Sequence, residues 1–285
     1  MKNVSRLLVF STYAITSVAI AQSAPAENSS SASDANADNA QLAVKLSNPV
    51  ASLISVPLQF NYDSSIGPDR DGHKNYLNIQ PVIPFEINDD WNMISRTILP
   101  VVSQSDTLPG SGSQHGIGDI TQSFFFSRRT PGANGLIWAL GPVILLPTAS
   151  DALLGSKKWG AGPTGLLLRQ SKGWTYGVLV NQIWSFASVS GKYSDRPPLS
   201  SIFVQPFLSY TTPTAWTYGV NLESTYDWHA HEATVPLNLS VSKLTRLGRQ
   251  PISFAGGVRY WLASNDSGPH GWGYRFTVTL LFPQK

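Results

Sequence analysis

The sequence contains no cysteine in its 285 residues. Disulfide bonds, thiol nucleophiles, thiolate metal ligands and a lipid-modified N-terminal cysteine are therefore excluded. Charged residues make up only 13% of the chain, about half the share of an ordinary soluble domain. After the first 21 residues, no stretch approaches the ~18 consecutive apolar residues that a membrane-spanning helix requires. A membrane protein built from helices is thus excluded.

Motifs for phosphate or nucleic-acid binding are also missing. The formal net charge is +3, but no basic run or patch accompanies it, so nucleic acid is not expected as a partner. The chain has neither a glycine-rich phosphate loop nor a G-x-S-x-G nucleophile motif. We expect no cofactor and no bound metal.

The N-terminus has the pattern of a secretory signal peptide. Lys2 and Arg6 precede an apolar core over Leu7–Ile20, and a small-x-small cleavage site ends at Ala21. Residues 1–21 are therefore predicted to be removed. Cleavage lowers the Lys and Arg total from 20 to 18, against 17 Asp and Glu, which leaves a net charge of about +1. Residues 22–45 are rich in Ser, Ala, Asn and Asp, and we expect a disordered periplasmic tail there.

Strict alternation of apolar and polar residues is the strongest positive signal. It is clearest over Trp216–Trp228, where Ser224 alone breaks the apolar phase. Side chains alternate across a strand, so this pattern predicts a strand with one apolar and one polar face. Its length and its terminal tryptophans fit a strand that crosses a bilayer between two aromatic girdles.

Twelve such segments are recognisable after residue 46. They are Val50–Tyr62, Tyr76–Ile87, Trp91–Val102, Ile117–Arg128, Leu136–Pro147, Trp159–Arg169, Trp174–Ala187, Ser201–Thr211, Ala215–Trp228, Ala233–Leu244, Ile252–Leu262 and Trp272–Phe282. Long and short connections alternate between them, and only His229–Glu232 breaks the long series. An even strand count with this alternation predicts an all-β fold, a transmembrane antiparallel β-barrel of about 12 strands over residues 46–285.

The predicted barrel implies a place and partners. A signal peptide followed by amphipathic strands indicates the outer membrane of a Gram-negative cell, with outer-membrane lipids around a monomer. The last strand alternates from Trp272 to Phe282 and resembles the signal read by the barrel assembly machinery, although Pro283, Gln284 and Lys285 follow it. Prolines inside several segments predict local bulges or shifted strand ends, because proline donates no ladder hydrogen bond.

The polar phase of the strands supplies the candidate interior residues. They are Asn78, Gln80, Arg96, Asp119, Asn181, Gln205, Asn221, Glu223, Asp227, Asn238, Arg259 and Arg275. Such residues either line a pore and set its selectivity or form an ion-paired plug that satisfies the interior. Twelve strands allow both, because the interior lies between that of a filled eight-stranded barrel and that of a wide porin.

Two loop clusters are further candidates for a site. His229 and His231 alternate in one loop, but no third metal ligand is evident, and an exposed loop without metal is the better interpretation. Asp151 with Lys157 or Lys158 could form an ion pair in an outer loop, at the rim or as part of a constriction. Each of the five histidines lies in or beside a predicted outer loop, so an enzyme acting from the outer rim stays an alternative.

One region resembles a known family. Residues 116–127 contain G-x-G-D, and residues 138–188 contain W-x-x-G-P, P-T-A-S-D, L-G-S-K, K-W-x-x-G-P and a G-x-L-x-N-x-x-W-S segment. The matching positions are Gly116, Gly118, Asp119, Pro147, Thr148, Ala149, Ser150, Asp151, Leu154, Gly155, Lys158, Trp159, Gly162, Pro163, Gly177, Asn181, Trp184 and Ser185. These residues are similar to a family of outer-membrane transporters related to the meta-pathway of phenol degradation, and the likeness extends loosely from Asn48 to the C-terminus. The resemblance implies a barrel that moves small solutes, aromatic or hydrophobic ones included.

The leading hypothesis is therefore passive passage of small solutes across the outer membrane. No energy-coupling domain and no N-terminal plug is expected from the sequence, so transport would be driven by diffusion. A lipase- or protease-type outer-membrane enzyme and a closed structural barrel are the alternatives.

Overall fold

The computed structural model describes residues 27–189 and 196–283. The predicted signal peptide of residues 1–21 lies outside this part. The elements are α1 (Glu27–Leu46), β1 (Ile54–Ile66), β2 (Gly72–Ile79), β3 (Val82–Glu86), β4 (Trp91–Ser105), β5 (Ser113–Ile117), β6 (Ile120–Arg128), a short 3-10 helix η1 (Ala133–Gly135), β7 (Leu136–Leu146), β8 (Lys158–Ser171), β9 (Trp174–Ser188), β10 (Ser200–Thr211), β11 (Trp216–Leu222), β12 (Ser224–Asp227), β13 (Glu232–Leu247), β14 (Gln250–Ala263) and β15 (Gly271–Phe282).

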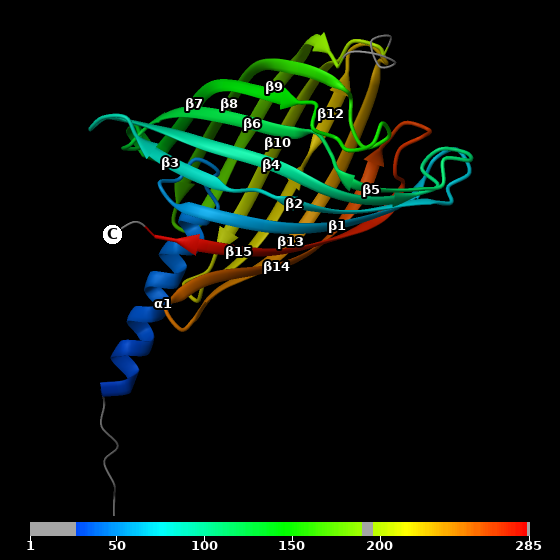
Figure 1. The fold of residues 1–285 in the computed structure, drawn as a ribbon. Helices are drawn as coiled ribbons and strands as arrows, with labels where there is room; N and C mark the ends of the chain where they lie inside the picture. The colour runs from blue at the N-terminus through cyan, green and yellow to red at the C-terminus, as the bar shows by residue number, and fades with distance from the viewer. Residues whose placement is uncertain (1–26, 190–195, 284–285) are drawn as a thin grey trace, which may run out of the picture.

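The strands form one closed antiparallel barrel (Figure 1). Each wall strand pairs with the wall strands before and after it, and β1 closes the ring against β15 over nine residue pairs. Three wall strands are interrupted, so that β2 continues as β3, β5 as β6, and β11 as β12. The fifteen segments therefore make twelve wall strands. The predicted 12-stranded antiparallel barrel is confirmed.

The connections are mostly longer at one end of the barrel than at the other. One end, here the loop end, carries residues 67–71, 106–112, 147–157, 189, 196–199, 228–231 and 264–270. The other end, the turn end, carries residues 87–90, 129–135, 172–173, 212–215 and 248–249. The predicted long connection over 63–75 is shorter than expected, because β1 and β2 remain paired as far as Ile66 and Gly72.

Two of the prolines lie where the ladder is disturbed. The chain leaves the sheet at Gln80 and Pro81, which separates β2 from β3, and the register between β13 and β14 shifts at Pro236. Pro142 faces Pro163 in the neighbouring strand, so two missing donors fall at one place. A register shift thus accompanies Pro236 and a break in the strand accompanies Pro81, whereas the ladder between β7 and β8 keeps its register at Pro142 and Pro163.

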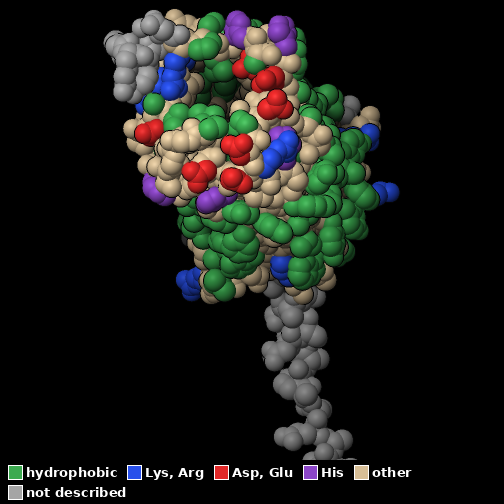
Figure 2. Space-filling model, turned by 90° about the vertical axis from the view of Figure 1, so that its right-hand side faces the viewer, with side chains coloured by type: hydrophobic (Ala, Val, Ile, Leu, Met, Phe, Trp, Pro, Cys, Tyr) green, Lys and Arg blue, Asp and Glu red, His purple; other side chains and the backbone are tan. Residues whose placement is uncertain are grey.

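The outer surface is apolar and is bounded by aromatic side chains. Eight of the nine tryptophans point outward, seven of them more than one-third exposed. Trp216 begins β11 near the turn end, and Trp228 follows β12 at the loop end, as two girdles require. Figure 2 looks onto the loop end, where Asp, Glu and His side chains gather around a hollow, while hydrophobic side chains cover the flank. Trp261 is the tryptophan that points inward.

The N-terminal residues differ from the disordered tail expected over 22–45, of which residues 22–26 lie outside the described ranges. Residues Glu27–Leu46 form helix α1, which approaches the turn end from outside (Figure 1). Its last turns enter the barrel mouth, where Ala43 is 4% exposed and packs with Leu244 and Leu281. No helix in the described part of the chain is long and apolar enough to cross a membrane. The apolar residues that follow residue 41 order the helix, since they find partners in the barrel.

The chain then continues inside the barrel. Residues 47–53 carry no strand, although the alternation predicts a strand from Val50. Val50 and Leu53 are instead 5% and 4% exposed within the interior. The expectation of no N-terminal plug is therefore wrong, because α1 and residues 47–53 occupy the turn-end mouth.

Candidate functional site: the barrel interior

The interior has two unlike walls. Inward side chains of β1, β2 and β11–β15 are mostly polar or charged, and those of β7 and β8 are largely apolar. Phe125 of β6, Leu179 of β9 and both Phe203 and Phe207 of β10 extend the apolar side, between polar residues of the same strands. The sequence pattern predicts the polar wall only. Its apolar counterpart comes from strands such as β9, where Val178, Leu179 and Val180 place apolar groups on both faces. Consecutive apolar residues are the available signal for this wall.

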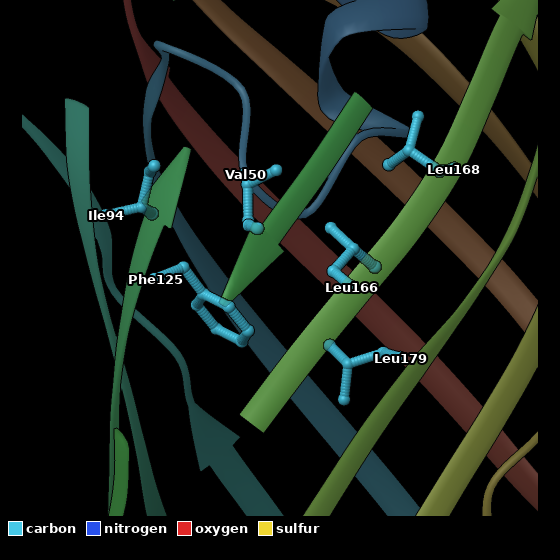
Figure 3. Packing of buried hydrophobic residues seen from close by; sticks show 7 residues of the cluster. Val50, Ile94, Phe125, Leu166, Leu168 and Leu179 are labelled. Atoms are coloured by element: carbon cyan, nitrogen blue, oxygen red, sulfur yellow. The ribbon is translucent and has the colours of Figure 1, made fainter. Parts of the chain in front are cut away.

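The apolar wall holds the N-terminal segment. Val50 packs inside a cluster with Ile94, Phe125, Ala139, Leu166, Leu168 and Leu179, all at most 5% exposed. Figure 3 shows Val50 reaching from the N-terminal segment toward these side chains, and the five labelled partners project from four different strands. Burial of a valine side chain contributes roughly 1.5–3 kcal/mol. This contact therefore anchors the segment inside the barrel.

Arg259 is the centre of the polar wall. Its guanidinium is 3% exposed and donates to both carboxylate oxygens of Asp63, at 3.0 and 3.3 Å. It also donates to the hydroxyl of Tyr76 and to the side-chain oxygens of Asn61 and Asn238. A buried guanidinium needs such partners, because an unpaired buried charge is strongly destabilising. The Asp63 carboxylate is held from a second side as well, since the indole N–H of Trp261 donates to it at 3.1 Å.

Glu223 joins Arg259 to a second arginine. Its carboxylate accepts two hydrogen bonds from Arg275, both 2.8 Å, and one from Arg259 at 3.1 Å. The two parallel bonds give the fork geometry that makes arginine–carboxylate pairs specific. Glu223 lies at the interruption between β11 and β12, where its backbone N–H bonds to the carbonyl of Pro236. Asp63, Glu223, Arg259 and Arg275 are called the charge cluster below.

A glycine makes room for this arrangement. Gly273 lies directly opposite Arg259 in β15. A Cβ atom there would come within 2.6 Å of the Asp63 carboxylate and of the Tyr62 carbonyl. Any larger residue would therefore displace the Asp63–Arg259 pair.

Two cavities lie on either side of the charge cluster. The loop-side cavity, about 360 Å³, is lined by Asp63, Lys74, Tyr76 and Trp261, with Leu153 from the loop over residues 147–157. The turn-side cavity, about 230 Å³, is bounded by α1 and by Asn221, Asn238 and Arg275 together with serine and threonine side chains. Residues that bond within the cluster line both cavities, so the cluster separates them.

A third, smaller cavity lies beneath the N-terminal segment. It measures about 170 Å³ and places Arg96 and Lys45 on its wall with Gln80. Arg96 donates to Gln80 at 3.2 Å, and no carboxylate in the described ranges lies within ion-pair distance of it. This guanidinium adds positive charge to the interior.

At the loop end, Asp119 fixes a loop. Its carboxylate accepts the N–H of Ala149 and both the N–H and the hydroxyl of Ser156, at 3.1, 2.6 and 2.7 Å. The loop over residues 147–157 is thereby held, and Gln104 donates to its Leu153 carbonyl from inside the barrel. Asp119, a predicted interior residue, instead has this structural role.

The outer-loop prediction is also corrected. Asp151 accepts the N–H of Leu153 at 2.7 Å and caps a turn. Lys157 donates to the Ala149 carbonyl, and Lys158 donates to the Ser188 hydroxyl at 2.6 Å. Of the ion pairs found in the described residues, none joins Asp151 to either lysine.

Most other predicted interior residues do point inward. The pairing register and the contacts place on the inner face Asn78, Gln80, Arg96, Asn181, Gln205, Asn221, Glu223, Asn238, Arg259 and Arg275. Asp227 lies at the loop-end rim, where it accepts the N–H groups of His229 and Ala230 at 2.8 and 3.0 Å.

Sequence reasoning misses several members of the polar wall. Asn61 and Asp63 share a phase in β1, but Asp63 falls in a predicted loop. Tyr76 and Trp261 are aromatic, so a list of polar residues omits them, although Trp261 has the same phase as Arg259. All four residues follow from the inward phase of their strands, if aromatic residues are included and the phase of β1 is continued into the predicted loop.

The chain resembles known proteins in its fold and not in its sequence. No protein-family model matches the chain, and no curated protein sequence matches it significantly. The structure is similar to the crystal structure of the COG4313 outer membrane channel from Pseudomonas putida F1, with a TM-score of 0.66 and 15% identity over 81% of this chain and 96% of that one. Weaker likenesses are to outer membrane phospholipase A from Escherichia coli, with a TM-score of 0.48 and 10% identity over 82% and 99% of the chains, and to the NanC porin, with 0.46 and 9% over 81% and 100%. At these identities the first likeness establishes a shared barrel fold.

Proposed function

We propose that the protein is an outer-membrane channel through which small solutes diffuse, with its turn end in the periplasm. The observation that carries this proposal is the pair of cavities on the polar wall, one on each side of the charge cluster. They mark an interrupted path through the interior. The shared fold with a solved outer-membrane channel supports the same function. In this proposal the protein is a monomer that is exported by its signal peptide and inserted into the outer membrane by the barrel assembly machinery.

The apolar wall favours solutes that have an apolar or aromatic body. A polar wall alone would favour hydrophilic solutes, whereas Phe203 and Phe207 pack against the apolar cluster from β10. A solute with an apolar or aromatic body can lie along this side. The proposed link to the transporter family related to phenol degradation agrees with this wall. The N-terminal segment and the charge cluster narrow the path, so the resting conductance should be small.

Planar-bilayer recordings test the channel. The mature chain should give small single-channel currents. A variant lacking residues 27–46 should give currents several times larger, because the turn-end mouth loses its helix. Correct folding of each protein is checked by the change in electrophoretic mobility on heating. If neither folded protein gives a current at any voltage, the barrel is not a channel, and the alternative of a closed structural barrel is favoured.

A further inference from the structure

We propose that the guanidinium groups of Arg259 and Arg275 form a binding site for a small organic carboxylate with an apolar body, and that Glu223 occupies this site when no solute is present. The inference rests on the proposed channel function and names its solute class. Three observations carry it: the geometry around Glu223, the charge balance of the interior and the side chains next to Glu223.

The geometry around Glu223 is that of a bound carboxylate. Three N–H groups from two arginines converge on its two oxygens at 2.8, 2.8 and 3.1 Å. Glu223 is the most exposed member of the charge cluster, at 22%, against 3% for Arg259 and 12% for Arg275. Its carboxylate is therefore the part of the cluster that can exchange with a ligand, while Asp63, 4% exposed, stays paired with Arg259.

The charge balance favours an anion. Among the described residues, the charge cluster and the walls of the three cavities hold five cationic side chains and two carboxylates, a net charge of +3. The cations are Lys45, Lys74, Arg96, Arg259 and Arg275, and the carboxylates are Asp63 and Glu223. A positive, poorly hydrated interior attracts anions and repels cations.

The side chains next to Glu223 fit an apolar body. The neighbouring strand β10 places Phe203 opposite Thr225 and Phe207 opposite Asn221, so that the two inward rings flank the level of Glu223. Both rings pack against the apolar cluster. A ligand whose carboxylate meets the arginines would lay its apolar part against these rings.

The exchange of carboxylates would take place between the two cavities. Tyr76, Asp63 and Trp261 line the loop-side cavity, and Arg275 lines the turn-side cavity. When a solute replaces Glu223, its carboxylate accepts the bonds that Glu223 gives up, so the two arginines stay paired. The bound solute then lies between the two cavities, in the path of other anions.

Benzoate is the probe for this site, with benzyl alcohol as its uncharged control. In bilayers, a potassium chloride gradient should give the reversal potential of an anion-selective channel, and benzoate should reduce the chloride current where benzyl alcohol does not. Calorimetry of the detergent-solubilised protein measures benzoate binding without requiring conduction.

The Glu223→Gln variant provides the decisive comparison. It keeps the shape of the side chain but removes the resident carboxylate, so benzoate should bind roughly tenfold more tightly. A tenfold change in affinity corresponds to the free energy of about one charge-assisted hydrogen bond. Arg275→Gln should weaken binding by a similar factor. Glu86→Gln is the matched control, because Glu86 pairs with Arg129 at the exposed turn end, outside the cluster.

The outcomes separate the two proposals. Benzoate binding in detergent together with silent bilayers rejects the channel and keeps the carboxylate site. A conducting protein that prefers cations overturns the carboxylate site and keeps the channel. The same conclusion follows if a conducting protein binds benzoate with equal affinity before and after the Glu223→Gln substitution.

Discussion

At the residue scale, Asp119 shows how one carboxylate can organise a loop. Its three hydrogen bonds connect the junction of β5 and β6 to residues 149 and 156. Gly155 is required beside it, since a Cβ there would lie 2.4 Å from an Asp119 oxygen. The loop over residues 147–157 therefore depends on a residue that is distant in the sequence.

The Asp119→Ala variant should loosen this loop. A hydrogen bond to a charged group is worth roughly 1.5–3 kcal/mol, so loss of all three bonds should raise the open population of the loop at least about tenfold. Limited proteolysis of the folded barrel measures this population. Asp151→Ala serves as the control, because Asp151 accepts a single local bond from Leu153. Equal cleavage rates in the two variants would contradict the assigned role.

At the element scale, the segment that follows α1 takes a position inside the barrel that the sequence did not predict. The composition up to residue 41 is that of a disordered tail, and the ordering comes from partners on distant strands. Val50 clusters with residues from β4, β6, β7, β8 and β9. No pattern local to residues 47–53 identifies those partners, so only the folded barrel places the segment inside.

The Val50→Asp variant should release this segment. A carboxylate without a partner cannot be buried among apolar side chains at an acceptable cost. Because the chain has no cysteine, an added Asn48→Cys substitution gives a single labelling site. We expect a membrane-impermeant maleimide to label this site much faster with Val50→Asp than with Val50 or the Val50→Ala control. A labelling rate unaffected by Val50→Asp would mean that the segment is held by α1 alone.

At the scale of the whole molecule, the barrel inverts the rule of soluble proteins. Many large apolar side chains are exposed on the outside, and the buried members of the polar wall form a hydrogen-bonded network. This arrangement is stable only where lipid surrounds the apolar band.

A charge introduced on the outer face should therefore destabilise the barrel more, the closer it lies to the middle of the membrane. Leu239, 47% exposed, lies in the middle of β13, and Leu247, 60% exposed, lies at the turn end of the same strand. Leu239→Arg should destabilise the barrel by roughly 2–4 kcal/mol and Leu247→Arg by at most about 1 kcal/mol. Urea unfolding in lipid vesicles measures both values. Equal costs would show that lipid does not cover the strand at Leu239.

The sequence by itself determined the class of fold, the strand count and the inner phase of most polar residues. Alternation is a local property with a period of two, and a membrane barrel enforces it strand by strand, so residues such as Arg259 and Trp216 could be assigned to their faces. The two-walled interior, the charge cluster and the N-terminal plug were decided only by the tertiary structure. Asp63, Glu223 and Arg259 come from separated parts of the chain, and closure of the ring between β1 and β15 brings them within bonding distance. The partner of a buried charge is set by this closure, and no local pattern of the chain encodes it.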